Sequence, residues 1–92
     1  MTSLTQENSD QLMKGFGLQQ AGRLDDAERL YRLVLSTSPD NVHALNLLGV
    51  LCVNSARPQE ALPLIEHAGK IDPRDADTWS NLGLALKDLR QL

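Results

Sequence analysis

The sequence predicts an all-α protein made of stacked antiparallel helix hairpins, and two observations support this prediction. The first is a period of 34 residues, shown by Pro39 and Pro73, by Ala27 and Ala61, and by Gly15, Gly49 and Gly83. The second is the composition: Leu, Ala, Gln, Glu and Arg are frequent and favour helices. By contrast, no long segment shows the alternation of apolar and polar residues that is typical of strands. A fixed period of this length is typical of repeats that each contribute one helix pair.

Five helices follow from this register, at residues 8–21, 24–37, 42–55, 58–71 and 76–90. Residues 8–41 and 42–75 then form two full repeats, and residues 76–92 form the first helix of a third repeat, either truncated or capping. The polar residues 1–7 are expected to be a flexible lead-in. The predicted architecture is therefore an α-solenoid of two full 34-residue repeats plus one extra helix.

Residues that break or start helices separate these segments. Gly22 and Asn54 mark the turn within each hairpin, and Pro58 suits a first helical turn. The two prolines of the period end the second helix of each repeat. Candidate caps for the helices that follow are Asp40, Asn41 and Asp75.

The recurring glycines indicate close contacts between helices. Gly15, Gly49 and Gly83 each fall in the middle of a predicted helix, where glycine costs about 1 kcal/mol relative to alanine. A repeated cost of this kind suggests that another helix approaches closely. Ala27 and Ala61 fit as the small partners in the facing helix.

One combination of residues resembles a known family. Trp79-x2-Leu82-Gly83-x2-Leu86, preceded by Ala61, Ile65 and Pro73, is similar to the tetratricopeptide repeat, whose units have 34 residues. The second repeat carries Leu45, Leu48, Gly49 and Cys52 in the same columns. The resemblance covers residues 8–92, although the first repeat has Gln11 and Lys14 in two apolar columns. Polar substitutions are expected in a terminal repeat, which lacks a neighbour on one side.

The resemblance implies a superhelix whose first helices line a concave groove, and a function in protein–protein interaction. The scaffold would bind a peptide or a helix of a partner. The expected groove residues are Leu12, Met13, Phe16, Gln20, His43, Asn46, Leu47, Val50, Asn54, Asn81 and Leu84. Further residues on the groove side are Gln19, Asp77, Ser80, Lys87 and Asp88. The apolar members either fill the shallow interior of a short stack or form an exposed binding surface.

Related repeats suggest two further points about the ligand. In the chaperone-binding type, which clamps a C-terminal carboxylate, the matching positions here hold Leu12, Phe16, Leu47, Asp77 and Asn81. Asp77 would repel a carboxylate, so that ligand class is not expected. Asn81 resembles the groove asparagines of sugar-transferring enzymes. Residues 27–51 also resemble bacterial repeat regions that precede glycosyltransferase or sulfotransferase domains. The alternative function is therefore an N-terminal accessory domain that presents protein substrates within such an enzyme.

Other classes of function find little support in the sequence. The net charge is −3 and basic runs are absent, which argues against nucleic acid and anionic membranes. Cys52 is the single cysteine and fills a core column, and it lies nine residues from His43, about 13 Å along one helix. We expect neither a catalytic residue, nor a metal site, nor a cofactor. The protein is not expected to be an enzyme, and without a secretory signal it is expected to be cytoplasmic.

The last predicted helix carries an apolar stripe formed by Trp79, Leu82, Leu86 and Leu89. A terminal cap would have a polar outer face, so we favour the interpretation that the chain is the front piece of a longer repeat protein. The same stripe makes a homodimer through this helix possible. The competing expectation is a monomer in which Trp79 folds back against residues 58–71.

Overall fold

The computed structural model of the protein describes residues 4–90, which form five helices and no strand. The helices are α1 (Leu4–Gln20), α2 (Leu24–Thr37), α3 (Val42–Asn54), α4 (Pro58–Ile71) and α5 (Ala76–Arg90). The predicted all-α class is confirmed, and α2 to α5 match the predicted helices to within one residue. Residues 1–3 of the expected lead-in and residues 91–92 of the third unit lie outside the described residues.

Helix α1 begins earlier than the sequence predicts. Residues 4–7, expected in a flexible lead-in, form the first turn of the helix. The physical reason lies in the next turn, where Asn8 is buried and its Nδ2 donates to Ser38 Oγ at 2.8 Å. This contact fixes the start of α1 against the α2–α3 connection. A polar segment can therefore be helical when a single side chain anchors it.

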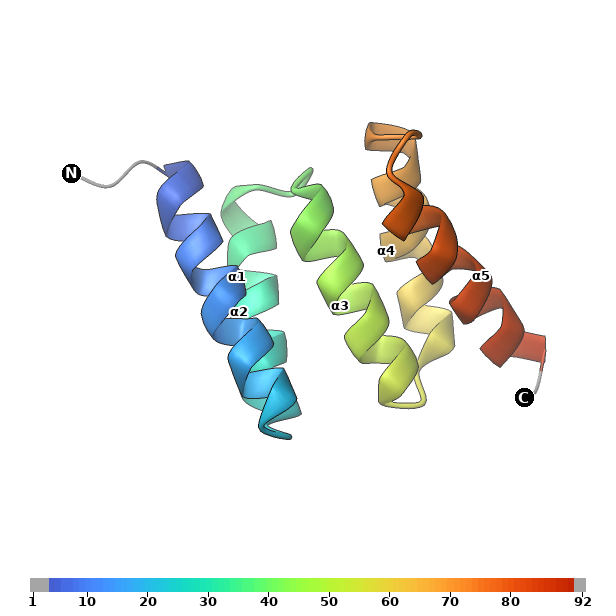
Figure 1. Ribbon diagram of the computed structural model, residues 1–92, viewed down its shortest axis with the longest axis horizontal. Coiled ribbons are helices and arrows are strands. Elements are labelled where there is room, and N and C mark those ends of the chain that lie inside the picture. Colours follow the sequence, from blue (N-terminus) through green and yellow to red (C-terminus); the bar gives the residue numbers. More distant parts are fainter. Residues whose placement is uncertain (1–3, 91–92) are drawn as a thin grey trace.

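The helices form two layers, which Figure 1 shows clearly. Helices α1, α3 and α5 lie nearer the viewer, and α2 and α4 lie behind them. Helix α3 contacts α1 and α5 within its layer, and it also packs against α2 and α4. The buried core fills the space between the layers, with Tyr31, Leu48, Leu51 and Ile65 as its largest fully buried side chains. The layer formed by α1, α3 and α5 carries the candidate groove.

The glycine column confirms the predicted close approach at two of its three positions. A Cβ atom on Gly15 would lie 2.7 Å from Tyr31 Cε1, and one on Gly49 would lie 2.6 Å from Ile65 Cγ1. The nearest facing atoms thus belong to Tyr31 and Ile65; of the two alanines that we expected to be the partners, Ala61 also lies opposite Gly49, through its backbone oxygen at 3.8 Å, whereas Ala27 is not among the nearest neighbours of Gly15. For Gly83 the prediction is wrong, because a Cβ atom there would meet nothing within 4 Å in the described part of the chain.

The turn inside each hairpin contains a residue in the left-handed conformation, with positive φ, at the same position of the repeat. Gly22 has φ = 82°, as expected for a glycine that ends a helix. Ala56, which follows 34 residues later, has φ = 61°. An L-residue in this conformation costs roughly 1–2 kcal/mol. The second hairpin therefore keeps the turn geometry of the first without its glycine.

The helix starts after the two period prolines use different caps. The Asn41 side chain accepts a hydrogen bond from the Ala44 backbone N at 3.0 Å, which confirms it as the cap of α3. Asp40, the other candidate, instead contacts His67 Nε2 at 2.9 Å. Asp75 precedes α5 and accepts from the Asp77 backbone N at 3.1 Å. Each cap satisfies one of the backbone N–H groups that the first turn of its helix leaves without a partner.

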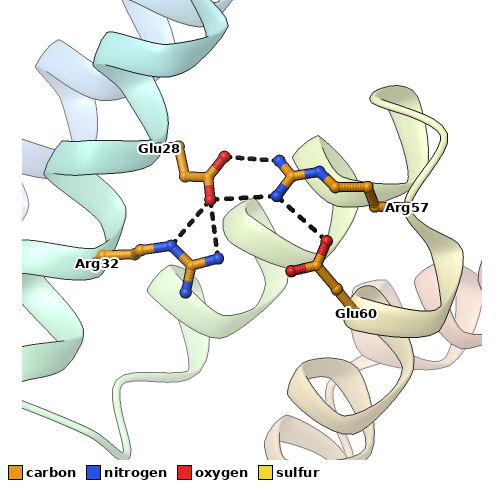
Figure 2. A network of polar contacts seen from close by, with 4 residues as sticks. All are labelled: Glu28, Arg32, Arg57 and Glu60. Carbon is orange, nitrogen blue, oxygen red and sulfur yellow. Dashed lines mark hydrogen bonds and ion pairs between the residues drawn. The ribbon is translucent and has the colours of Figure 1, made fainter.

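An ion-pair network joins the two hairpins behind the groove (Figure 2). Arg57 Nη2 lies 2.6 Å from Glu28 Oε1 on α2, and Arg57 Nη1 lies 3.3 Å from Glu60 Oε2. Arg32 contacts the same Glu28 carboxylate at 2.8 Å. The hydrogen bond from Arg57 is the main reason that the pKa of Glu28 is lowered, and that bond in turn raises the pKa of Arg57. Among residues 4–90, the equivalent Arg23 pairs within its own repeat, with Asp26.

Candidate partner-binding groove

Two adjoining hollows lie on the layer formed by α1, α3 and α5. The apolar hollow has a volume of about 460 Å³ and is lined by Ser9, Leu12, Met13, Phe16, His43 and Leu47. The polar hollow has a volume of about 360 Å³ and is lined by Phe16, Gln19, His43, Asn46, Leu47, Val50, Asp75, Asp77 and Asn81. They share Phe16, His43 and Leu47, so they form one continuous groove. Both volumes are within the roughly 300–1,000 Å³ typical of ligand sites.

The apolar side chains of the groove divide between core and surface. Leu12 is buried in the core, and Leu47 packs against that core while lining both hollows. Phe16 is 47% exposed and Met13 is 73% exposed. The interior interpretation therefore fits Leu12, and the exposure that the binding-surface interpretation requires is found at Phe16 and Met13. Phe16 and Met13 are accessible to a partner, whereas Leu12 forms the floor beneath them.

The polar hollow is crossed by a chain of hydrogen bonds between α3 and α5. Asn81 Nδ2 donates to Asn46 Oδ1 at 3.1 Å, and Asn46 Nδ2 donates to Thr78 Oγ1 at 2.8 Å. Thr78 Oγ1 donates in turn to Asp75 Oδ2 at 3.2 Å. Asn46 is buried, and both ends of its amide are occupied. Asn46 therefore joins α3 to α5 and also lines the polar hollow.

Some predicted groove residues lie apart from the two hollows. Gln20, Asn54 and Leu84 are exposed and line neither of them. Conversely, Ser9 and Asp75 line the groove although the sequence did not place them there. The signal for Ser9 is its position one helical turn before Met13 on the same face of α1. Which of the lining residues bind a partner stays a prediction.

The stripe on α5 is only partly exposed. Trp79 is 53% exposed and Leu86 is 45% exposed, while Leu82 packs against the core and Leu89 is half-buried. Trp79 Nε1 donates to the Pro73 carbonyl at 2.7 Å. Trp79 also lies beside Ile65 and Gly69 of α4. The indole thus folds back toward α4, as in the competing expectation, but it leaves about half of its surface open.

The structure also places the single cysteine and the side chains that could ligate a metal. Cys52 is fully buried, and burial raises the pKa of its thiol, which keeps it in the neutral form that suits a core position. Within residues 4–90, no group of three or more His, Cys, Asp or Glu side chains is placed to hold a metal ion. None of the described helices has the length and apolar character that a membrane span requires.

Comparison with known proteins agrees with this architecture. A family model for the tetratricopeptide repeat matches residues 18–89. The chain belongs to the tetratricopeptide repeat family. The repeats of this family are protein-interaction modules and do not themselves catalyse reactions. The matched residues include all of α2, α3 and α4 and nearly all of α5.

Several curated proteins contain a region similar to this chain. A mouse protein O-mannosyl-transferase, TMTC3, is 32% identical over 75% of the chain. A barley protein named as the probable peptide N-acetylglucosaminyltransferase SPINDLY is 32% identical over 89% of it. The CTR9 homolog of Arabidopsis thaliana is 36% identical over 74%. The chain spans only 8%, 9% and 7% of these three relatives, so the similarity concerns their repeat regions.

Proposed function

We propose that this chain is a protein-interaction scaffold that binds a peptide or helical segment of a partner in the groove and catalyses no reaction itself. The observation that carries the proposal is the exposure of Phe16 and Met13 over a buried floor. Exposed apolar side chains that gather in a hollow mark interaction sites in soluble proteins. Helix α1, which holds both side chains, packs against α2 and α3 and contributes Leu12 to the core, so the surface is preformed.

A second role for the same groove is supported by the names of two relatives. TMTC3 and SPINDLY are named as transferases. In this alternative the repeats present protein substrates to the catalytic domain of a larger enzyme. The groove would then bind the substrate segment. Loss of the Phe16 side chain would lower the modification rate of a protein substrate and leave that of a free small acceptor unchanged.

The binding proposal is tested by selecting ligands from a random-sequence peptide library displayed on phage. Selected peptides are then titrated against the wild type and the Phe16→Ser variant by fluorescence anisotropy. Removing a large apolar contact of about 1.5–3 kcal/mol should weaken binding about tenfold or more. Phe16 is half-exposed, so its replacement should leave folding largely intact.

Leu33→Ser provides the matched control. Leu33 is 49% exposed, close to the value for Phe16, but it lies on α2 in the other layer. This variant should bind the selected peptides as the wild type does. Peptides that bind the Phe16 and Leu33 variants equally well would show that the groove is not the binding site.

We also propose that the outer face of α5 binds a second copy of this chain. Supporting evidence is the space over Gly83, which in the other two repeats is filled by Tyr31 or Ile65. Trp79 and Leu86 are exposed on the same helix. In a two-fold contact, these large side chains of each copy would cover the open glycine of the other. Burial of each contributes about 1.5–3 kcal/mol against the cost of association.

The oligomeric state tests this second proposal. Sedimentation equilibrium at tens of micromolar should show a dimer for the wild type and a monomer for Leu86→Glu. Leu33→Glu, which places the same charge on a similarly exposed leucine of α2, should remain dimeric. A wild-type monomer throughout this range would contradict the proposal.

A further inference from the structure

The two hollows of the groove differ in chemistry, and this difference bears on the kind of segment that fits. The apolar hollow presents Met13 and Phe16 over Leu12. The polar hollow adds two carboxylates, those of Asp75 and Asp77, at the α5 end. Neither hollow is lined by a lysine or an arginine. A bound segment therefore meets an apolar surface at one end and negative charge at the other.

Most polar groups of the polar hollow already have partners within the protein. Asn46 is bonded to Thr78 and Asn81, and Gln19 Oε1 accepts from the Tyr31 hydroxyl at 2.8 Å. Asp75 accepts from the Asp77 backbone N and from the Thr78 hydroxyl. These contacts hold the hollow in shape and leave few polar groups available to a ligand.

The Asp77 carboxylate is different. Its side chain is exposed and makes no hydrogen bond or ion pair within residues 4–90. It lies in the first turn of α5, where the helix dipole favours negative charge. Asp75, two residues earlier, adds a second negative charge at the same end of the hollow. A cationic side chain can approach this pair without competing with a lysine or an arginine that lines the groove.

We propose that the groove selects protein segments that place a large apolar side chain in the apolar hollow and a lysine or arginine against Asp77. This inference rests on the proposed binding function and adds the chemistry of the ligand. Complementary charge sets specificity and register more than it sets affinity. The apolar contact supplies most of the binding, and Asp77 determines which segments are accepted and in which direction they lie.

Peptide selection on two forms of the protein tests the inference. Peptides selected on the wild type should combine an aromatic or large aliphatic residue with a lysine or arginine at a preferred spacing. Selection on Asp77→Lys should lose the basic residue. Peptides selected on the wild type should bind Asp77→Asn about threefold more weakly and Asp77→Lys about tenfold more weakly. Both differences should shrink as salt is raised.

Asp25→Lys is the matched control for charge. Asp25 is exposed and is the second residue of α2, as Asp77 is the second residue of α5, but it lies outside both hollows. Any general effect of the added charge or of the lost first-turn acid should therefore be equal in the two variants. Asp25→Lys should bind the selected peptides within about twofold of the wild type.

A paired change locates the contact itself. Replacing the basic residue of a selected peptide by glutamine should weaken its binding to the wild type and have little effect on Asp77→Asn, because the two groups interact directly. Equal losses on both proteins, or selected peptides without basic residues, would overturn this inference. If Phe16→Ser still weakened binding, the groove proposal would stand. Peptides indifferent to both Phe16 and Asp77 would contradict both proposals.

Discussion

Gly49 and Gly83 occupy the same position in the repeat, yet their surroundings are opposite. Gly49 faces the buried side chain of Ile65 so closely that an added Cβ would lie 2.6 Å from it. Gly83 faces open space. Both glycines weaken their own helices by about 1 kcal/mol relative to alanine. At Gly49 the close packing of α4 offsets this cost, whereas within residues 4–90 nothing offsets it at Gly83.

Glycine at this position of the repeat therefore favours the packing of the neighbouring helix and not the stability of the helix that contains it. Gly15 and Tyr31 repeat the arrangement in the first hairpin, with an aromatic ring in place of Ile65. The column therefore accepts side chains of different shape, provided that the glycine leaves room for them. Substitutions in the glycine column, in the two turns and at the ion pair between the hairpins test this comparison.

The largest effect is expected for Gly49→Leu. Its Cβ alone would collide with Ile65, which is fully buried and cannot move aside easily. Overpacking of this kind should lower the free energy of unfolding by about 3 kcal/mol or more, as measured by urea denaturation. Gly17→Leu is the control, because Gly17 has open space around it in the last turn of α1. An unchanged denaturation midpoint for Gly49→Leu would mean that the contact is absent.

Gly83→Ala should have the opposite sign. Alanine is the better helix former, and the added methyl group meets no neighbour, so dilute protein should be stabilised by about 1 kcal/mol. Gly15→Ala should instead destabilise the protein, because Tyr31 stands in the way. Thermal unfolding followed by circular dichroism compares the two. Similar losses at both positions would show that Gly83 is covered in solution, as in the proposed dimer.

The turns provide a smaller contrast between the two hairpins. Ala56→Gly should stabilise the protein by about 0.5–1 kcal/mol, because relief of the left-handed strain exceeds the entropic cost of glycine. Gly22→Ala should destabilise it by about 1 kcal/mol. Differential scanning calorimetry would give both values. A loss of stability for Ala56→Gly would contradict the expected strain at that turn.

The smallest effect concerns the ion pairs that link the hairpins (Figure 2). Glu28→Gln should lower stability at neutral pH by about 1 kcal/mol or less, because the carboxylate is partly exposed. The pKa of Glu28 is lower in the folded protein than its usual 4.5, so the contribution is present above about pH 4.5 and is lost on acidification. The difference in free energy of unfolding between the wild type and the variant should therefore become smaller in acid.

Glu66→Gln is the control for this last prediction. Glu66 is exposed on α4 and forms no ion pair with any of residues 4–90. Its replacement should leave the stability profile with pH close to that of the wild type. If the difference in free energy of unfolding between the wild type and Glu28→Gln stayed constant in acid, the ion pair with Arg57 would not be the source of the stabilisation.

The sequence located the helices well because the signals that define them are local. Asn41 accepts a bond from Ala44 three residues on, and Gly22 needs only its own left-handed geometry. The groove residues were predicted less completely. Phe16 and Leu47 line it as expected, but Leu84 does not, and Asp75 does. Lining depends on how three helices are tilted, which periodicity along one helix does not encode.

The amino-acid sequence by itself determined the repeat: its period, its five helices and the family to which the chain belongs. These depend on spacing within one turn or one hairpin, where residue type and position suffice. Only the tertiary structure decided that Asn46 joins α3 to α5, that Arg57 reaches Glu28 in the preceding repeat, and that Gly83 is open. Each of these depends on which side chain of a distant helix faces the residue in question. That is fixed only when the two layers of helices pack together.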